Sequence, residues 1–520
     1  MSFHIEQVLG LVFGAALLFG PLDAAEQLVL SQSTNSQFEA YRADGQLVWT
    51  AVPIFDEARR LIRIERNEGS RIAPSVDTGM RDAGGEWSPL AEVVTLGDES
   101  FFFGTEPVVD SQGHLWTQIN VERELRVLRR DAVSGEWSVD TTYLSSGAGE
   151  EALLIDSSDR ISVVFREGNQ IIVIRFAPGL GWSPPETIVT VEDGFFQDIS
   201  AGVDALGNIV VLYQLELPST FRIVGVVFDA ASGTWSPPQL VSGRQQRVVT
   251  VPTVIASDNG EHVFVAYLDI DTARRPGLYA RKFVSPDEGF GEIERVPGTA
   301  RASLPQLGSF AEYSAVVDDQ GDLTLPFSVE IPFGDDRLFL FRAARRQSGE
   351  WQIPQTLHVY VGDFPFFLEF GDADTNSDGD VAIILRYDDA FLDEVVWVFM
   401  FDRESNEWRR DLIHGRVNES TTRSRVAFGS GDEVLATYLT GGVDERFTSR
   451  LYRNGEWLDA LGVADDVVAS ALHETVFDGD AFALVGEFGT FFTGDVRVLS
   501  SQFVPQVDSA QGEAGSDTQR

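Results

Sequence analysis

Short runs of alternating apolar and polar residues, separated by turn residues, fill the chain after residue 26. One stretch reads DISAGVDALGNIVVLYQL and continues FRIVGVVFDAASGTWSPPQLV, which predicts four strands at 199–203, 209–214, 222–228 and 234–241. The runs are rich in Val, Ile, Phe and Tyr and are bounded by Gly, Asp, Asn and Ser, as is typical of strands and hairpins. No later stretch has a helical period. The pattern therefore predicts an all-β protein built from four-stranded antiparallel units, with strands A to D in order.

An aromatic residue recurs at the start of strand D, and its spacing indicates a repeat protein. The successive spacings lie between 45 and 61 residues, as expected for propeller blades. Because Pro cannot donate to a strand ladder, the Pro residues that follow several of these positions make D an edge strand. We expect the aromatic ring to pack between neighbouring units. The recurring residues are Trp87, Trp137, Trp182, Trp235, Phe290, Trp351, Trp408 and Trp457.

The turns between strands A and B give the number of units. Nine such turns are found, which predicts a single β-propeller over residues 26–504 with nine repeat units; seven or eight blades remain open. The last unit lacks a Trp strand, so we expect the N-terminal strand at 27–31 to complete it and close the ring. The polar tail at 505–520 is predicted to be disordered. The turn positions are Gly45, Gly113, Asp159, Gly207, Gly260, Gly321, Gly379, Gly431 and Gly479.

The repeat resembles those of sialidase-like propeller proteins of bacterial envelopes. Their blades read roughly D-x-x-G-N-x-x-V-x-W, then Y-x-x-R-F, then G-W-S-x-P. The sequence differs from the Asp-box S-x-D-x-G-x-x-W, because here Asp204 and Trp235 lie two strands apart. The resemblance implies a propeller and leaves the activity open. The matching residues are Asp204, Gly207, Asn208, Trp235, Ser236 and Pro238.

Composition narrows the setting in which the protein works. The net charge of −42 disfavours nucleic acid and anionic lipid as partners. The chain has no Cys, which excludes disulfides and thiolate sites. The apolar run from Val8 to Leu22 predicts a signal peptide over residues 1–25, ending at Ala24 or Ala25, and hence a periplasmic or secreted protein; a buried N-terminal strand or helix is the alternative. No later segment has the length of a membrane span.

The candidate catalytic and metal-binding residues do not form a known constellation. A sialidase-like enzyme needs three Arg residues converging on a carboxylate, with a Tyr–Glu pair and an acid. Here Arg recurs at one position per unit, so we expect these side chains to pair with neighbouring acidic turns. The His residues show no metal-ligand spacing, and no G-x-S-x-G or phosphate loop is present. The recurring Arg residues are Arg175, Arg281, Arg342 and Arg453.

Clusters of Phe mark the D–A loops, which connect strand D of one unit to strand A of the next. In propellers these loops gather on one face around the channel mouth, and exposed aromatic clusters are typical of binding sites. The clusters therefore predict a ligand-binding face, although they could instead plug the channel. The predicted ligand-binding residues are Phe101, Phe102, Phe103, Phe195, Phe196, Phe364, Phe366 and Phe367.

The stretch DADTNSDGDVAI, residues 372–383, has the spacing of a calcium loop. Asp374, Asn376 and Asp378 would supply the first, third and fifth ligands, and Asp380 its carbonyl. The twelfth position is Leu385 instead of a bidentate Glu, so this is not an EF-hand. Calcium is thus the only cofactor that the sequence indicates. A bare acidic turn, which needs Gly at position 379 in any case, is the alternative.

Together these features predict an exported, non-enzymatic β-propeller that binds a glycan or a protein ligand on its D–A loop face. Two alternatives stay open. One is a divergent sialidase-like glycoside hydrolase or polysaccharide lyase, which would need convergent Arg, Tyr and acidic residues in one central pocket. The other is a purely structural envelope protein.

Overall fold

The computed structural model describes the chain from Leu28 to Pro505, and side chains within residues 107–460. Outside the description are 1–27, 33–37, 43–46, 56–60, 69–84, 88–90, 96–100, 104–106, 122–123, 145–147, 193–194, 218–219, 244–246, 249–251, 271–275, 300–301, 304–314, 334–335, 363–367, 389–392, 418–423, 430–431, 441–445, 463–468, 479–480, 491–494 and 506–520. The predicted signal peptide and polar tail therefore lie outside the described residues.

The chain divides into two compact units. The first comprises Met1–Ser75 and Val359–Val361, and the second comprises Val76–His358 and Gly362–Arg520. The first unit holds one antiparallel four-stranded sheet in sequential order. This division differs from the single domain over 26–504 that the sequence predicts. The strands of the first unit are β1 (Leu28–Gln32), β2 (Phe38–Arg42), β3 (Leu47–Phe55) and β4 (Leu61–Glu68).

The described residues of the second unit form eight antiparallel sheets, numbered here in chain order. Sheet 1 is β7 (Phe101–Phe103), β8 (Val108–Val109), β9 (Leu115–Val121), β10 (Glu124–Arg130) and β11 (Trp137–Leu144). Sheet 2 is β12 (Ala148–Ile155), β13 (Ile161–Glu167), β14 (Gln170–Ala177), β15 (Gly181–Trp182) and β16 (Glu186–Thr190). Sheet 3 is β17 (Phe195–Val203), β18 (Ile209–Leu217), β19 (Thr220–Asp229), β20 (Thr234–Trp235) and β21 (Gln239–Leu240).

The next three sheets repeat this order with longer or more divided strands. Sheet 4 is β22 (Arg247–Val248), β23 (Thr253–Ala256), β24 (Val263–Ile270), β25 (Pro276–Ser285), β26 (Gly289–Phe290) and β27 (Glu294–Arg295). Sheet 5 is β28 (Ala302–Ser303), β29 (Val316–Val317), β30 (Leu323–Phe333), β31 (Asp336–Gln347), β32 (Glu350–Trp351) and β33 (Gln355–Gly362). Sheet 6 is β34 (Leu368–Thr375), β35 (Val381–Asp388), β36 (Asp393–Asp402) and β37 (Glu407–Val417).

The last two sheets lead to the C-terminus. Sheet 7 is β38 (Ser424–Phe428), β39 (Val434–Thr440), β40 (Arg446–Arg453), β41 (Glu456–Trp457) and β42 (Leu461–Gly462). Sheet 8 is β43 (Ala469–Asp478), β44 (Ala481–Thr490) and β45 (Asp495–Pro505), with β5 (Gly85–Trp87) and β6 (Ala91–Thr95) on its outer side.

The first strands of consecutive sheets lie against one another, as β12 does on β17, β17 on β23, β34 on β38 and β38 on β43. Up-and-down sheets packed in this way form a β-propeller, so the predicted all-β class and propeller architecture are confirmed. Nine units were expected from the turns. Eight of them correspond to the sheets of the second unit, and the turn at Gly45 belongs to the separate sheet of the first unit.

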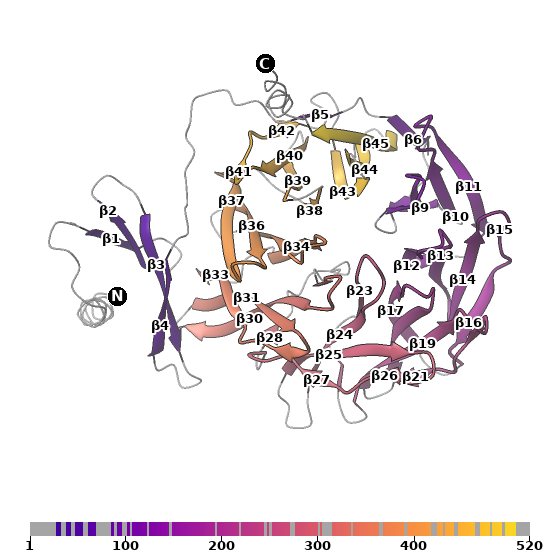
Figure 1. Cartoon of the computed structure of the whole chain (residues 1–520), viewed down its shortest axis with the longest axis horizontal. Helices are drawn as coiled ribbons and strands as arrows, with labels where there is room; N and C mark the ends of the chain where they lie inside the picture. The colour runs from indigo at the N-terminus through magenta and orange to yellow at the C-terminus, as the bar shows by residue number, and fades with distance from the viewer. Residues whose placement is uncertain are drawn as a thin grey trace, which may run out of the picture. The chain divides into compact units, whose positions relative to one another are not determined.

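The strand predicted to complete the last unit is the wrong one. β1, which covers the predicted strand at 27–31, pairs with β2 inside the first unit. Instead, Trp87 in β5 pairs with Phe503 of β45, and β6 pairs with the other half of β45. Figure 1 shows these strands side by side although nearly the whole unit separates them in sequence. The chain therefore enters its first repeat through an outer strand, and GGEWSPL supplies the Trp that the last unit lacks.

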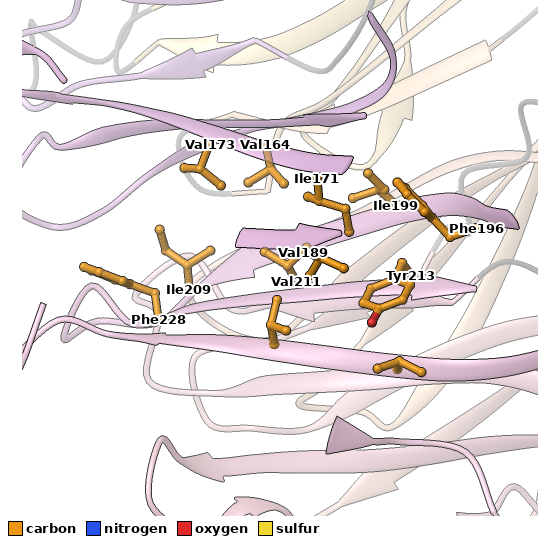
Figure 2. Packing of buried hydrophobic residues seen from close by; sticks show 12 residues of the cluster. Val164, Ile171, Val173, Val189, Phe196, Ile199, Ile209, Val211, Tyr213 and Phe228 are labelled. Carbon is orange, nitrogen blue, oxygen red and sulfur yellow. The ribbon is translucent and has the colours of Figure 1, made fainter. Parts of the chain in front are cut away.

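Each described core lies between two sheets. Between sheets 2 and 3, side chains such as Val164 and Val173 face Ile209 and Val211, all nearly inaccessible to solvent (Figure 2). Burying each such side chain contributes about 1.5–3 kcal/mol, which holds the sheets face to face. The outer-strand aromatic covers the edge of this core. Trp235 packs on Phe228 with ring centroids 5.2 Å apart.

Some of the recurring Trp residues also donate a hydrogen bond to the preceding sheet. The indole Nε1 of Trp182 donates to Asp140 at 2.5 Å, and that of Trp351 donates to Glu294 at 2.7 Å. Each acceptor lies on an outer strand of the sheet before. This confirms that the repeated Trp packs between neighbouring units.

Candidate functional site

The predicted Phe clusters are only partly visible in the described residues. Phe101–Phe103 form β7, and Phe195 begins β17, but their side chains lie outside the description, as do residues 363–367 with Phe364, Phe366 and Phe367. Phe196 is 2% exposed and packs edge to face on Tyr213, with ring centroids 5.8 Å apart. Its side chain points into the core between sheets 2 and 3, so it presents no surface to a ligand. For Phe196 the expectation is therefore corrected.

A β-bulge lies where the D–A loop enters sheet 3, at what is here called the D–A end of the sheets. The pairing of β17 with β18 shifts register between Gln197 and Ile199, which leaves Asp198 unpaired in the ladder. Asp198 has a φ of 54°, a conformation that costs a non-glycine residue free energy. Corresponding shifts occur in β12 and β34. Bulges of this kind re-aim side chains and are frequent beside binding sites.

An arginine from a neighbouring sheet lies at two of these bulges. Arg166 of β13 donates from Nη1 to the Phe196 carbonyl at 3.3 Å. Burial raises the pKa of Asp198, and the positive charge of Arg166 acts in the opposite direction. Arg425 of β38 donates from Nη1 to the carbonyl of Gly371, the bulged residue of β34, at 2.8 Å. Charged donors are thereby fixed at the D–A end by backbone contacts.

Polar side chains recur at this end in the second strand of five sheets. The sixth residue of that strand is polar in five sheets and is Leu268, Leu439 or Gly486 in three. The sequence analysis missed this position, although it is visible as one polar residue that ends an apolar run, as in IVVLYQ and VAIILR. The five polar residues are Asn120, Arg166, Gln214, Ser328 and Arg386.

The acidic turn at 376–380 has the geometry of its repeat. Asn376 Oδ1 accepts the backbone N–H groups of Asp378 at 3.1 Å and Asp380 at 2.9 Å. Gly379 has a φ of 85°, which the turn requires. The same side-chain turn is formed by Asp204, whose Oδ1 accepts from two backbone N–H groups at 2.8–2.9 Å. The calcium-like spacing thus coincides with the Asx turn that joins strands A and B in other sheets.

The aspartates before this turn join sheets 6 and 7. Asp374 Oδ2 accepts the backbone N–H of Phe428 at 2.7 Å, and Asp372 Oδ2 accepts that of Val426 at 3.1 Å. β38 is the first strand of its sheet, so these N–H groups face the neighbouring sheet and need an acceptor. Burial and then the negative charge of Asp258 raise the pKa of Asp374, to about 7, against the effect of its backbone hydrogen bonds.

The predicted calcium ligands are occupied in different ways. Asp374 binds sheet 7, Asn376 closes the turn, and Asp380 Oδ1 accepts the backbone N–H of Arg403 at 2.8 Å. A calcium loop needs its oxygens to converge on one point, and this donor set does not fit that requirement. No group of three or more His, Asp or Glu within the described part of the chain could hold a metal ion. Calcium binding stays a prediction, tested below.

The recurring Arg residues do not converge, as expected, but two of them have other partners than predicted. Arg175 pairs with Glu186 at 2.8 Å, and Arg453 pairs with Glu433 of an acidic turn at 2.6 Å. Arg281 and Arg342 instead donate to backbone carbonyls of their own outer strands, such as Gly291 at 2.8 Å. These guanidinium groups hold the outer strands in place.

No protein-family model and no curated protein matches the chain. Solved structures with a similar fold include the polysaccharide lyase Uly1, with 9% identity and a TM-score of 0.40 over 78% of this chain and 90% of that one. A PL25 ulvan lyase bound to -[GlcA(1-4)Rha3S]- has 14% identity and a TM-score of 0.41 over 69% and 96%. The Dos1 propeller has 11% identity and a TM-score of 0.40 over 67% and 78%.

At these identities and TM-scores, the activities of the similar proteins do not carry over to this chain. The resemblance of the repeats to those of sialidase-like propeller proteins likewise has no family match behind it. Among the described residues, no helix is long and apolar enough to cross a membrane.

Proposed function

We propose that the second unit is a non-enzymatic binding propeller, exported from the cell, that holds a glycan or a protein ligand at the D–A end of its sheets. The observation that supports this most is the strained Asp198 with the charge of Arg166 close to it. Asp198 occupies a strained bulge, and Arg166 of the neighbouring sheet lies beside it. Such strain is retained where a side chain must be held in a defined place.

The chemistry at this end suits a ligand rich in hydroxyl or amide groups. Carboxylate, guanidinium and amide side chains from several sheets reach the same end, and each can donate or accept in directions that neutral apolar loops cannot. A sialidase-like centre would need three Arg on one carboxylate. Arg166 and Arg425, from sheets 2 and 7, are each tied to a neighbouring backbone carbonyl, which favours binding over such catalysis.

The proposal is tested by glycan-array and protein-capture binding with the exported protein and two variants. Arg166→Gln removes the charge beside Asp198 and is expected to weaken binding roughly tenfold, since a charged hydrogen bond contributes about 1.5–3 kcal/mol. Arg175→Gln is the matched control, because Arg175 lies at the opposite end of the same sheet, where it pairs with Glu186 at 2.8 Å.

Two outcomes contradict the proposal. Equal ligand affinity of Arg166→Gln and the parent would place the ligand elsewhere. Turnover of a bound glycan, seen as new reducing ends or unsaturated uronate absorbance, would establish one of the enzymatic alternatives instead.

A further inference from the structure

A cavity opens between sheets 2 and 3 at the end opposite to the D–A end, where strands A and B are joined (the A–B end). Its volume is about 300 Å³, at the lower limit of small-molecule sites. The ring of Phe228 and aliphatic side chains such as Leu154 and Ile209 form its apolar wall, and two guanidinium groups and a carboxylate border it. The residues that carry the argument are Asp156, Arg160, Arg175, Leu180, Ile209 and Phe228.

This cavity is called a slot below. The equivalent slot between sheets 5 and 6 is filled by a side chain. Arg345 lies over the ring of Phe401 at 3.5 Å, just as Arg175 lies over Phe228 at 4.2 Å. Both Arg residues pair with the second residue of strand B in their sheets. The two slots are therefore built on the same framework.

Besides Arg345, a second arginine fills the slot between sheets 5 and 6. Arg403, two residues after Phe401, reaches back from sheet 6. Its Nη1 binds Asp318 at 2.7 Å and its Nη2 binds Asp322 at 2.9 Å. Both carboxylates are almost fully buried, so they require this cation.

Two changes open the slot between sheets 2 and 3 and alter its charge. Ala230, two residues after Phe228, stands where Arg403 stands. Arg160, four residues after Asp156, stands where Asp322 stands, and its Nε binds Asp156 at 2.6 Å. A carboxylate pair that binds a guanidinium is thus replaced by one carboxylate neutralised by Arg160, with Arg175 close by.

We propose that this slot binds a small ligand consisting of a carboxylate on a compact apolar body. Arg160 and Arg175 pair with Asp156 and Glu186, and each guanidinium keeps further N–H donors, because it has five. Their side chains are 41% and 30% exposed, so a ligand can reach them. Leu180, 88% exposed at the rim, extends the apolar wall.

Charge makes the slot selective. The chain as a whole carries −42, which repels anions from most of its surface. In this slot Asp156 and Glu186 balance the two guanidinium groups, so an anion meets less repulsion there than on the acidic surface, and the remaining N–H donors and the apolar wall are the two features that can hold it. Anion binding at low concentration should therefore be confined to this slot and depend on both features.

The test uses phenylacetate and its neutral isostere phenylacetamide as probes in calorimetric titrations of the whole protein. The parent is expected to bind the acid roughly tenfold or more tightly than the amide, as expected for a charged hydrogen bond. The variant Ala230→Arg combined with Arg160→Asp rebuilds the filled slot of sheets 5 and 6. It should have the melting temperature of the parent and should no longer bind phenylacetate. Arg126→Gln, remote from the slot, should bind as the parent does.

A second variant keeps the test decisive if the rebuilt slot does not fold. Arg175→Gln should bring the affinities of acid and amide together. The proposal is overturned if the parent binds neither probe saturably or binds both equally. It is also overturned if the folded double variant, or Arg175→Gln, still prefers the acid as the parent does.

Discussion

Replacing Asp374 by Asn should remove a pH dependence of stability while keeping the hydrogen bond to sheet 7. Asp374 Oδ2 accepts the N–H of Phe428 at 2.7 Å and thereby joins sheets 6 and 7. Asn has the same shape and keeps one acceptor oxygen for Phe428, but it has no charge. It loses the second oxygen, which accepts the backbone N–H of Thr375 at 2.8 Å, and that loss is the same at every pH. The substitution Asp374→Asn thus separates the contact from the ionisation.

The magnitude follows from the pKa of Asp374, which burial raises from 3.8 to about 7. Between these two values the folded protein keeps a proton that the unfolded chain has released, so stability falls as pH rises. The slope is about 1.4 kcal/mol per pH unit, and the whole window corresponds to about 4 kcal/mol as an upper limit. Above pH 7 the cost of burying the charge is fully present. Below pH 4 it is absent.

The assay is denaturant unfolding of the parent and of Asp374→Asn at pH 5 and pH 8. The difference between the two proteins cancels the titration of other groups. Relative to its parent, the variant should gain about 2–3 kcal/mol on going from pH 5 to pH 8, because the pH range from 5 to 7 covers two of the three units of the window. Asp378→Asn, in the exposed turn, should follow the parent at both pH values.

An unchanged difference between parent and Asp374→Asn at the two pH values would refute the reasoning. It would mean that the carboxylate between sheets 6 and 7 does not titrate in this window.

Three further predictions concern the Trp contacts, calcium and the N-terminus. Trp457→Phe should cost about 1–2 kcal/mol more in unfolding free energy than Trp235→Phe, because the indole N–H of Trp457 donates to Asp411 whereas that of Trp235 has no acceptor; equal costs would contradict this. Calcium and magnesium at matched ionic strength should raise the melting temperature equally in the parent and in the Asp374→Ala, Asp378→Ala double variant; a calcium-specific rise that the double variant loses would establish a site. Mass spectrometry of the native protein should find residues up to 24 or 25 removed, and an intact cytoplasmic chain would refute export.

Local pattern was sufficient to predict the strands and turns, but it could not predict where the repeat begins. GGEWSPL looks the same whether Trp87 ends its own unit or completes another. Only its pairing with Phe503, more than 400 residues away, decides between the two. The alternation of apolar and polar residues and the turn preference of glycine act over a few residues. The residue at which each repeat begins depends instead on contacts between segments that are far apart in the sequence.

The candidate sites show the same limit. D-x-N-x-D-G is the spacing of a calcium loop and also of an Asx turn, and the sequence cannot show that Asp374 points to the neighbouring sheet. Asp198 could not be singled out because acids are abundant and its bulge arises from register. By contrast, an alignment of the repeats shows that Ala230 occupies the position of Arg403, since each residue follows a Phe and an Asp.

Sheet 8 combines strands from the beginning and the end of the second unit, and this has a consequence for biosynthesis. Its outer strands β5 and β6 are among the first parts of the second unit to be made, and β45 is the last. During synthesis on the ribosome, the outer strands have no partner until Pro505 has emerged. They need protection for that time, since unpaired strands aggregate. A premature stop that removes only β45 would leave Trp87 exposed and the first and last repeats without their shared strand.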